Sequence, residues 1–287
     1  MVNLPPKETY HFADLPLTRL HYLKCGQGPP LILVPATVSE IKNWLTLVQF
    51  MAQRFTVYFF ELPGHGKSIK FKNEYRSEFV AETVGDFVDY LGYKRFNIMG
   101  FSFGGLLTIK TLIRLKERID SVILFSPYVS YKSLLYSKSQ FNTLKIIAKM
   151  LKRKQIKKLI LNIMHNKKTV NLIELILRNV GNIDKLDGFR ENLLNFKDST
   201  LDVFTYQLNE ILDIRFKVEN CTFKNKLYFG MSVHDSLLDY EITKNILKKM
   251  FENMKVEKFY LPYHQPLKPF TFEELNSNFF RILEQIE

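Results

Sequence analysis

A serine flanked by glycines is the first residue of this sequence that could act as a nucleophile. Residues 100–105 read GFSFGG and follow the apolar run FNIM, with Ser102 at the centre. Because FNIM predicts a strand and the following GGLLTIKTLIRL predicts a helix, Ser102 lies at a strand-to-helix corner. Small residues two positions before and after the serine let the strand and the helix approach closely, which leaves the hydroxyl group exposed. The backbone N–H of Phe103 then lies at a helix N-terminus, where it could stabilise an oxyanion.

The same pattern also fits an ordinary glycine-rich turn between a strand and a helix, or a phosphate-binding loop. Two phosphate-binding patterns, G-x-G-x-x-G and G-x-x-x-x-G-K-[ST], are not matched by these residues. A serine hydroxyl is a poor nucleophile until a base takes its proton, and an acid must orient that base. The candidate bases that follow Ser102 are His165, His234 and His264.

Five stretches of sequence extend the pattern beyond the serine. They are LHYLKCGQGPPLILVPA, ELPGHGKS (61–68), MGFSFGG (99–105), FGMSVHDSLLD (229–239) and YHQPLKP (263–269). In these motifs and in their order, the chain resembles the α/β-hydrolase superfamily over nearly its whole length. The resemblance implies an α/β fold, in which helices flank a mostly parallel central sheet, and a catalytic order of Ser, then Asp or Glu, then His.

The resemblance implies that Ser102, Asp235 and His264 are the catalytic residues. His264 follows the run VEKFYLP and precedes a predicted helix, which is where the family places its base. Asp235 follows the run NKLYFGM, but it lies five residues after Gly230, a longer interval than in many relatives. Asp239 therefore stays open as an alternative acid.

Two other loops differ from the family pattern. The family usually has His-Gly after its first central strand, whereas this chain has Pro35-Ala36-Thr37. The second oxyanion donor is expected to be the backbone N–H of Thr37, so the change of side chains need not remove it. Glu61 stands where relatives commonly have Asp, and His65 matches a family loop residue that is structural rather than catalytic.

The identity of the nucleophile narrows the chemistry. Family members that open epoxides or cleave carbon–halogen bonds have Asp at the turn, so Ser102 implies acyl transfer through a covalent acyl-enzyme. We expect a small-molecule ester or thioester with an apolar acyl group as the substrate. A carbon–carbon bond hydrolase or an acyltransferase with the same three residues, and a catalytically silent binding module, stay open as alternatives. No metal or organic cofactor is implied, because side chains and water complete this chemistry.

Strands and helices must position these residues. Predicted strands and helices alternate along the sequence before and after a long segment that shows a helical pattern only. The stretch RLHYLKCGQGPP predicts paired strands around a glycine turn, and further strands are predicted at 31–36, 55–61, 96–101, 121–127, 225–231 and 256–262. Helical patterns cover 40–53, 77–91, 104–117, 240–254 and 271–286. This alternation predicts a parallel sheet covered on both faces. Since residues 132–216 show helical periodicity only, the sequence predicts a core of 1–131 and 217–287 with a helical cap inserted at 132–216.

The net charge of +12 is concentrated in the predicted cap. Residues 132–168 contain eleven Lys and Arg and no Asp or Glu, whereas the rest of the chain holds 30 basic and 29 acidic residues. The stretch 141–164 predicts an amphipathic helix or helix pair whose apolar face covers the site and supplies an acyl pocket. The cationic face fits a solvated surface, or a docking surface for an acidic acyl carrier, a coenzyme A phosphate or an anionic membrane. Nucleic acid is not expected, because arginine is scarce and no accompanying motif occurs.

The composition is typical of a soluble cytoplasmic protein. The chain is 46% apolar and contains only Cys25 and Cys221, which are too few for a disulfide scaffold. No uncharged apolar segment approaches the roughly 20 residues that a membrane-spanning helix needs. The first residues, MVNLPPKETYHFADLPL, lack the apolar core of a secretory signal.

Overall fold

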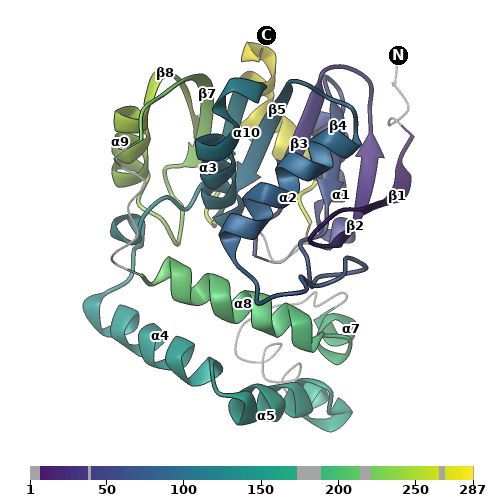
Figure 1. Ribbon diagram of the computed structural model, residues 1–287. Helices are drawn as coiled ribbons and strands as arrows, with labels where there is room; N and C mark the ends of the chain where they lie inside the picture. Colours follow the sequence, from purple (N-terminus) through teal and green to yellow (C-terminus); the bar gives the residue numbers. More distant parts are fainter. Residues whose placement is uncertain (1–6, 38–39, 173–188, 214–220, 265–268, 287) are drawn as a thin grey trace.

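Short runs of β-branched and aromatic residues form a single eight-stranded sheet. The computed structural model describes residues 7–37, 40–172, 189–213, 221–264 and 269–286 (Figure 1). The strands are β1 (Thr9–Asp14), β2 (Arg19–Cys25), β3 (Pro30–Val34), β4 (Thr56–Phe60), β5 (Phe96–Phe101), β6 (Ile119–Phe125), β7 (Phe223–Ser232) and β8 (Phe251–Phe259). They lie in the order β1-β2-β4-β3-β5-β6-β7-β8, and all neighbours from β4 to β8 are parallel. This arrangement confirms the predicted α/β fold with a mostly parallel sheet.

The amino-terminal edge of the sheet differs from the sequence expectation. β1 pairs with β2 in antiparallel orientation, through a turn closed by a hydrogen bond from the Leu15 N–H to the Thr18 carbonyl (2.9 Å). The glycine turn after Cys25 instead joins β2 to β3, and β4 lies between these two strands in the sheet. The expectation of a strand pair around this glycine turn was therefore wrong, because the next strand along the chain is placed beyond β4.

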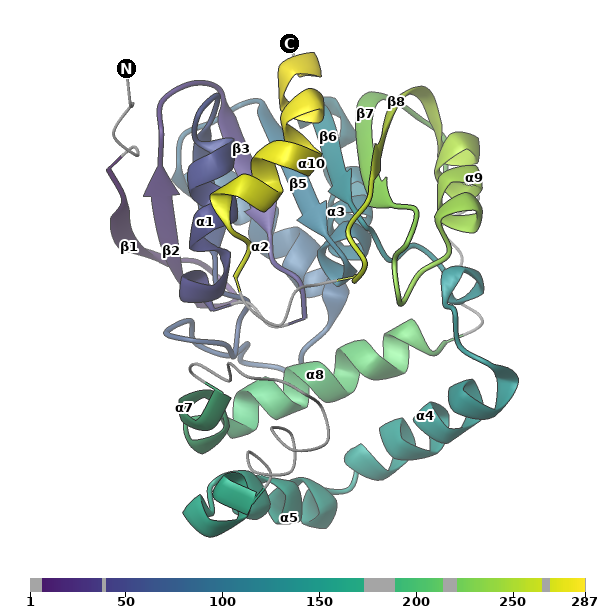
Figure 2. The same cartoon turned by 180° about the vertical axis from the view of Figure 1, so that it is seen from behind.

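Helices cover both faces of the sheet. They are α1 (Ile41–Met51), α2 (Ser77–Tyr90), α3 (Phe103–Leu115), α9 (Tyr240–Met250) and α10 (Phe272–Gln285), with a 3-10 turn at Lys116–Arg118. α1 and α10 pack on one face, as Figure 2 shows, and the residues of α2, α3 and α9 join the apolar core on the other. The central strands β4 and β5 are buried along their whole length, as expected for a sheet covered on both sides.

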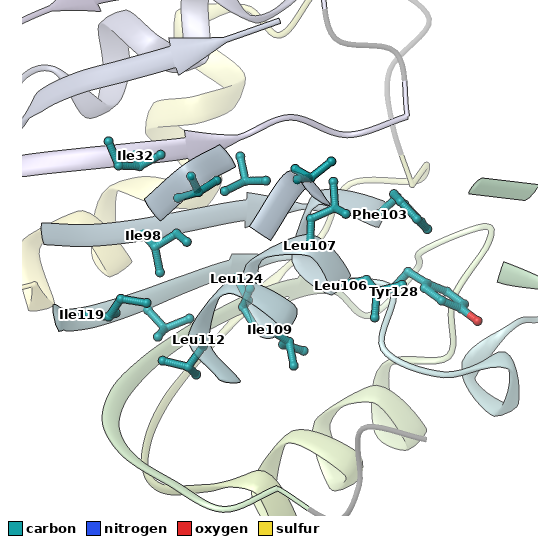
Figure 3. Close-up of a cluster of buried hydrophobic side chains, with 14 of the residues drawn as sticks. Ile32, Ile98, Phe103, Leu106, Leu107, Ile109, Leu112, Ile119, Leu124 and Tyr128 are labelled. Carbon is teal, nitrogen blue, oxygen red and sulfur yellow. The ribbon is translucent and has the colours of Figure 1, made fainter. Parts of the chain in front are cut away.

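The core between the sheet and α3 fixes the position of the Ser102 corner. Ile32, Ile98 and Leu124 come from the neighbouring strands β3, β5 and β6, and they belong to the same buried cluster as Leu106 and Ile109 of α3 (Figure 3). Because apolar residues recur every three to four positions along α3, one side of this helix packs on the strands. The start of α3 is thereby held against the carboxyl ends of β3, β5 and β6.

The elements described between residues 132 and 216 are all helical. They are a 3-10 turn (Tyr131–Ser133), α4 (Lys138–Leu151), α5 (Lys154–Met164), α7 (Phe189–Leu194) and α8 (Asp198–Ile211). α8 lies next to the core at the carboxyl ends of the parallel strands, and α4 and α5 lie beyond it (Figures 1 and 2). Contacts with the core include a hydrogen bond from Ser199 Oγ to the Gly64 carbonyl (2.7 Å) and one from the Tyr128 hydroxyl to the Ile211 carbonyl (2.6 Å). The domain boundaries at 131/132 and 216/217 stay a prediction, and residues 214–220 lie outside the described chain.

The predicted amphipathic stretch 141–164 forms the two helices α4 and α5 rather than one. Among the described helices, none combines the length and the apolar character that crossing a bilayer would require.

Candidate active site

Ser102 occupies the single position between β5 and α3, and its backbone is in an unusual conformation. Its φ of 53° and ψ of −123° fall in a region that non-glycine residues rarely adopt. Three backbone hydrogen bonds hold this conformation: the Ser102 N–H donates to the Phe125 carbonyl (3.1 Å), and the Ser102 carbonyl accepts from Gly105 (2.9 Å) and Tyr128 (2.9 Å). A strained backbone that its surroundings fix in this way is common at functional sites.

The glycines of GFSFGG are required by close approach between backbone segments. A Cβ atom on Gly100 would lie 2.4 Å from the Gly104 carbonyl oxygen, and one on Gly104 would lie 2.6 Å from the Val34 carbonyl oxygen. A Cβ atom on Gly105 would lie 2.4 Å from the Cβ atom of Pro127. The three glycines therefore let α3 start directly against β5 and against the ends of β3 and β6.

His264 lies beside Ser102, as the sequence predicted for the base. The Ser102 hydroxyl oxygen is 2.7 Å from His264 Nε2, and the His264 backbone N–H donates to Ser236 Oγ (3.2 Å). The imidazole is almost fully buried, beside the ring of Phe101 at 5.9 Å between centroids. The other two candidate bases lie elsewhere: His165 is exposed and bonds to the Phe196 carbonyl. The ring of His234 lies 6.4 Å from that of Tyr260 between centroids, in a tilted arrangement. The predicted motif around His264 extends into residues 265–268, which lie outside the described chain.

Asp235, rather than Asp239, is the carboxylate next to His264. Asp235 Oδ2 lies 2.8 Å from His264 Nδ1, and its side chain is fully buried. Its other oxygen accepts the backbone N–H groups of Leu237 and Leu238, each at 2.9 Å. Because a carboxylate only accepts hydrogen bonds, Nδ1 carries the proton and Nε2 is free to accept from the Ser102 hydroxyl.

Asp239 has a different role in the fold. Its Oδ1 accepts the backbone N–H of Ile242 at 2.8 Å and thereby caps the N-terminus of α9. Since this carboxylate is engaged at the helix start, the structure brings Asp235 and not Asp239 to His264.

The two predicted oxyanion donors lie at neighbouring chain segments. Phe103 is the first residue of α3, so its backbone N–H has no acceptor within the helix. The loop that contains Thr37 follows β3, whose end lies against Gly104 as described above. The Thr37 carbonyl accepts from His65 Nε2 at 3.1 Å, while residues 38–39 are outside the described chain. The use of the Thr37 N–H as a donor stays a prediction.

The loop 61–68 contains several buried polar residues, and the sequence did not reveal the roles of two of them, Glu61 and His65. The Glu61 carboxylate accepts from the backbone N–H groups of Lys67 (2.6 Å) and Ile41 (3.2 Å) and from His21 Nδ1 (2.9 Å). One carboxylate thus joins the end of β4 to β2, to the start of α1 and to its own loop. The burial of His65 lowers the pKa of its imidazole to about 4, so this ring is neutral near pH 7. Two of the partners of Glu61, Ile41 and His21, lie 20 and 40 residues away from it along the chain. No local motif could therefore identify these contacts.

A large cleft in the described part of the chain lies away from Ser102. It measures about 1400 Å³ and lies between residues 63–78 of the core and helices α4 and α8. Seven lysines and five acidic residues line it, and neither Ser102 nor His264 does. The expectation that the apolar side of 141–164 supplies an apolar pocket is therefore not met by this charged cleft.

No metal-binding arrangement is found in the parts of the chain that are described: no group of three or more His, Cys, Asp and Glu side chains is placed to hold an ion. Neither Cys25 nor Cys221 takes part in a disulfide bond.

Comparisons with known proteins agree with this fold. The model of a protein family described as alpha/beta hydrolase fold matches residues 29–161. The dihydrolipoyllysine-residue acetyltransferase component of the acetoin cleaving system of Cupriavidus necator is 30% identical over 119 residues, which are 41% of this chain and 32% of that protein. The soluble epoxide hydrolase of Corynebacterium sp. strain C12 is 31% identical over 97 residues, or 34% of each chain. The match therefore spans about a third of these relatives.

A solved structure extends the similarity to nearly the whole chain. A bacterial membrane phospholipase A, described as a virulence factor, has a TM-score of 0.70 with 18% identity, and the alignment covers 97% of this chain and 86% of the other. At this identity the likeness concerns the fold. Taken with the family match over 29–161 and the strand order of the sheet, it shows that the chain has the alpha/beta hydrolase fold.

Proposed function

We propose that this protein is a serine hydrolase that cleaves an ester or a thioester through a covalent acyl-enzyme. The observation that carries the proposal is the continuous hydrogen-bonded chain from Ser102 Oγ through both nitrogens of His264 to the buried Asp235 carboxylate, with distances of 2.7 and 2.8 Å. A nucleophile, a base within reach of its proton and an acid that orients the base are the parts that acyl transfer needs. The hydrolases among the matched proteins support the coarser class.

The first half of the reaction forms the acyl-enzyme. Ser102 Oγ attacks the carbonyl carbon of the substrate while His264 Nε2 takes the hydroxyl proton, and the carbonyl oxygen becomes an oxyanion. The N–H of Phe103 and, as we expect, that of Thr37 donate to this oxyanion. When the intermediate collapses, the bond to the leaving alcohol or thiol breaks and the leaving group takes the proton from Nε2. The Asp235 carboxylate stabilises the imidazolium in both steps.

The second half releases the acyl group. His264 Nε2 takes a proton from water, and the resulting hydroxide attacks the acyl carbon. The second tetrahedral intermediate expels Ser102 Oγ, which recovers the proton from Nε2, and a carboxylic acid leaves. An alcohol or thiol that replaced water in this step would make the protein an acyltransferase, as the Cupriavidus relative is named.

The serine argues against the epoxide chemistry for which the Corynebacterium relative is named. An alkoxide that opens an epoxide forms an ether, and attack by water has no good route to cleave an ether. A carboxylate nucleophile would form an ester, which water can hydrolyse. A serine at position 102 therefore fits acyl transfer, in which the covalent intermediate is itself an ester.

Labelling with a fluorophosphonate probe tests the proposal. The wild-type protein is expected to react at Ser102, and the Ser102→Ala and His264→Ala variants are expected to lose the label. Two matched variants control for general effects: Ser139→Ala removes an exposed serine of α4, and His165→Ala removes an exposed histidine. An unlabelled wild-type protein, or a label that persists in Ser102→Ala, contradicts the proposal and favours a binding module. A panel of p-nitrophenyl esters and acyl thioesters of graded chain length then tests the expected apolar acyl group.

A further inference from the structure

The outer sides of α4 and α5 carry large aliphatic side chains that the described chain leaves uncovered. Ile146, Ile147 and Met150 of α4 and Leu159 and Ile163 of α5 are exposed, Ile146 by 62% and Leu159 by 55%. The described residues bury no side chain of α5, although its apolar and polar residues are well segregated. We refer to these five side chains as the outer α4–α5 face.

The contacts of α4 with α8 show that its exposed residues point away from the core. Ala148 is buried, and its carbonyl accepts a hydrogen bond from Asn209 of α8 at 3.3 Å. Since successive residues of a helix are rotated by about 100°, Ile146 and Met150 lie on the side opposite Ala148. This apolar side of α4 therefore faces outward rather than toward α8.

The same relationship holds for α5. Lys157 forms an ion pair with Asp202 of α8, which fixes the side of α5 that faces the core. Leu159 and Ile163 lie roughly opposite Lys157 on the helix. In both views of the fold, α4 and α5 form the outermost layer with α8 between them and the sheet (Figures 1 and 2). The apolar sides of both helices thus belong to one end of the molecule.

Cationic side chains surround this apolar face. Arg153, Lys154 and Lys158 are exposed on α5 or at its junction with α4. The segment 132–168 contributes eleven positive charges and no acidic residue. Because Lys157 is paired with Asp202, it belongs to the contact with α8 and not to this surface, contrary to what its place in the basic run suggested.

We propose that the outer α4–α5 face docks the protein on an anionic lipid bilayer. Helices that lie in a membrane interface combine an apolar side, which enters the boundary between headgroups and acyl chains, with Lys and Arg that contact anionic headgroups. A bilayer accepts scattered aliphatic side chains without a matching pocket. A second copy of this chain fits less well, because two faces with the same excess of positive charge would repel each other.

Docking in this orientation turns the carboxyl ends of the parallel strands, where Ser102 lies, toward the membrane. The inference does not depend on the proposed hydrolase activity, because binding can be measured with the Ser102→Ala protein. The two proposals can therefore fail separately.

Co-sedimentation with lipid vesicles tests the inference. The Ser102→Ala chain is mixed with vesicles of phosphatidylcholine alone or of phosphatidylcholine with phosphatidylglycerol, at low and at high salt. We expect binding to the anionic vesicles, and weaker binding at high salt because the lysine contribution is screened. Ile146→Ser with Leu159→Ser should weaken the partition coefficient at least about tenfold, since two large apolar groups are lost. Lys154→Gln with Lys158→Gln should weaken it by about fivefold for each lysine.

Matched variants on other helices provide the control. Ile113→Ser removes an exposed isoleucine of α3, and Lys248→Gln removes an exposed lysine of α9, so both should bind vesicles like the parent chain. Three results would overturn the proposal: no binding to anionic vesicles, equal binding to both kinds of vesicle, or unchanged binding by the Ile146→Ser/Leu159→Ser variant. A concentration-dependent dimer that this same variant abolishes, seen by light scattering without lipid, would replace the bilayer with a second copy of the chain. Circular dichroism of each variant checks that it is folded.

Discussion

The Nε2 atom of His264 lies 2.7 Å from the Oγ atom of Ser102, although 162 residues separate the two in the chain. The contact is possible because β5 and β8 run parallel in one sheet, so that the loops at their carboxyl ends meet at the same edge. Ser102 follows β5 directly, and His264 comes five residues after the end of β8 at Phe259. Asp235 follows β7, the strand between β6 and β8, and joins the same cluster.

The first prediction separates the two aspartates that the sequence left as alternatives. In Asp235→Asn the amide group next to Nδ1 favours the tautomer that is protonated on Nε2, which cannot accept the Ser102 proton. We expect kcat for ester hydrolysis to fall on the order of 10³- to 10⁴-fold. Asp239→Asn should leave kcat within about twofold and the melting temperature unchanged, since asparagine is an equally good helix N-cap. A comparable loss of kcat in both variants would contradict the assignment of Asp235.

The second prediction concerns the glycines at the Ser102 corner. A Cβ atom on Gly104 would lie 2.6 Å from the Val34 carbonyl oxygen and 2.8 Å from that of Pro35, and both are backbone atoms that cannot move independently. Gly104→Ala should therefore lower the free energy of unfolding by about 1–3 kcal/mol and displace the loop that carries Thr37. We expect kcat to decrease as well, because the oxyanion donors lose their alignment.

Gly85 of α2 offers a control for this substitution. A Cβ atom there would meet only the Leu115 side chain, at the ordinary contact distance of 3.4 Å. Gly85→Ala should raise the free energy of unfolding by about 0.5–1 kcal/mol, since alanine favours the helix. Urea unfolding of both variants checks the pair, and a Gly104→Ala protein as stable as wild type would show that the corner tolerates a side chain.

Most of the sheet and the Ser102 turn could be predicted from the sequence, because local patterns encode them. Asp235 and His264 were named from the family resemblance, with Asp239 left open as an alternative to Asp235. The run FNIMGF corresponds to β5 residue for residue, and GFSFGG located Ser102 at its end. The edge strand β1 was not recognised. Its residues TYHFAD are largely exposed, so no buried run marks the strand, and the turn at Leu15–Thr18 contains no glycine.

The choice between Asp235 and Asp239 and the supporting contacts could not be settled from the sequence, because they depend on long-range packing. The interval between Gly230 and Asp235 was unusual, and only the start of α9 at Tyr240 shows that Asp239 is a helix cap. Glu61 departed from the family pattern without a visible reason. Its partners His21 and Ile41 come from other elements of the fold, and no spacing along the chain connects them.

The third prediction tests Glu61. In Glu61→Gln one carboxylate oxygen becomes an amide N–H₂ group, which would face a donor from Lys67, Ile41 or His21. A buried donor without an acceptor and the loss of a charge-assisted hydrogen bond should lower the free energy of unfolding by about 2–3 kcal/mol. Glu252→Gln, at an exposed position of β8, should change it by less than about 0.5 kcal/mol. Equal unfolding free energies in the two variants would mean that the Glu61 contacts contribute little.

The last prediction concerns the pH dependence of stability that His65 imposes. This residue is buried, its Nε2 donates to the Thr37 carbonyl, and its Nδ1 has no hydrogen-bond partner among the described residues. Burial lowers the pKa of His65 from 6.5 to about 4, with a further lowering by Lys197 and opposing effects of the Thr37 carbonyl and Glu40. The folded protein therefore keeps the ring neutral in a range where the unfolded chain already binds a proton.

The sign of the effect follows from this difference in proton binding. Above about pH 6.5 the ring is neutral in both states, and between pH 6.5 and pH 4 only the unfolded state is protonated, so stability falls as the pH is lowered. Between pH 6.5 and pH 4, protonation of His65 in the unfolded chain should lower the free energy of unfolding by about 3 kcal/mol. His65→Gln removes the titration and keeps an N–H donor near Thr37. Urea unfolding at several pH values should show wild type losing stability relative to this variant between pH 6.5 and 4. Parallel curves for the two proteins would show that His65 is protonated in the folded state and that its burial does not hold the ring neutral.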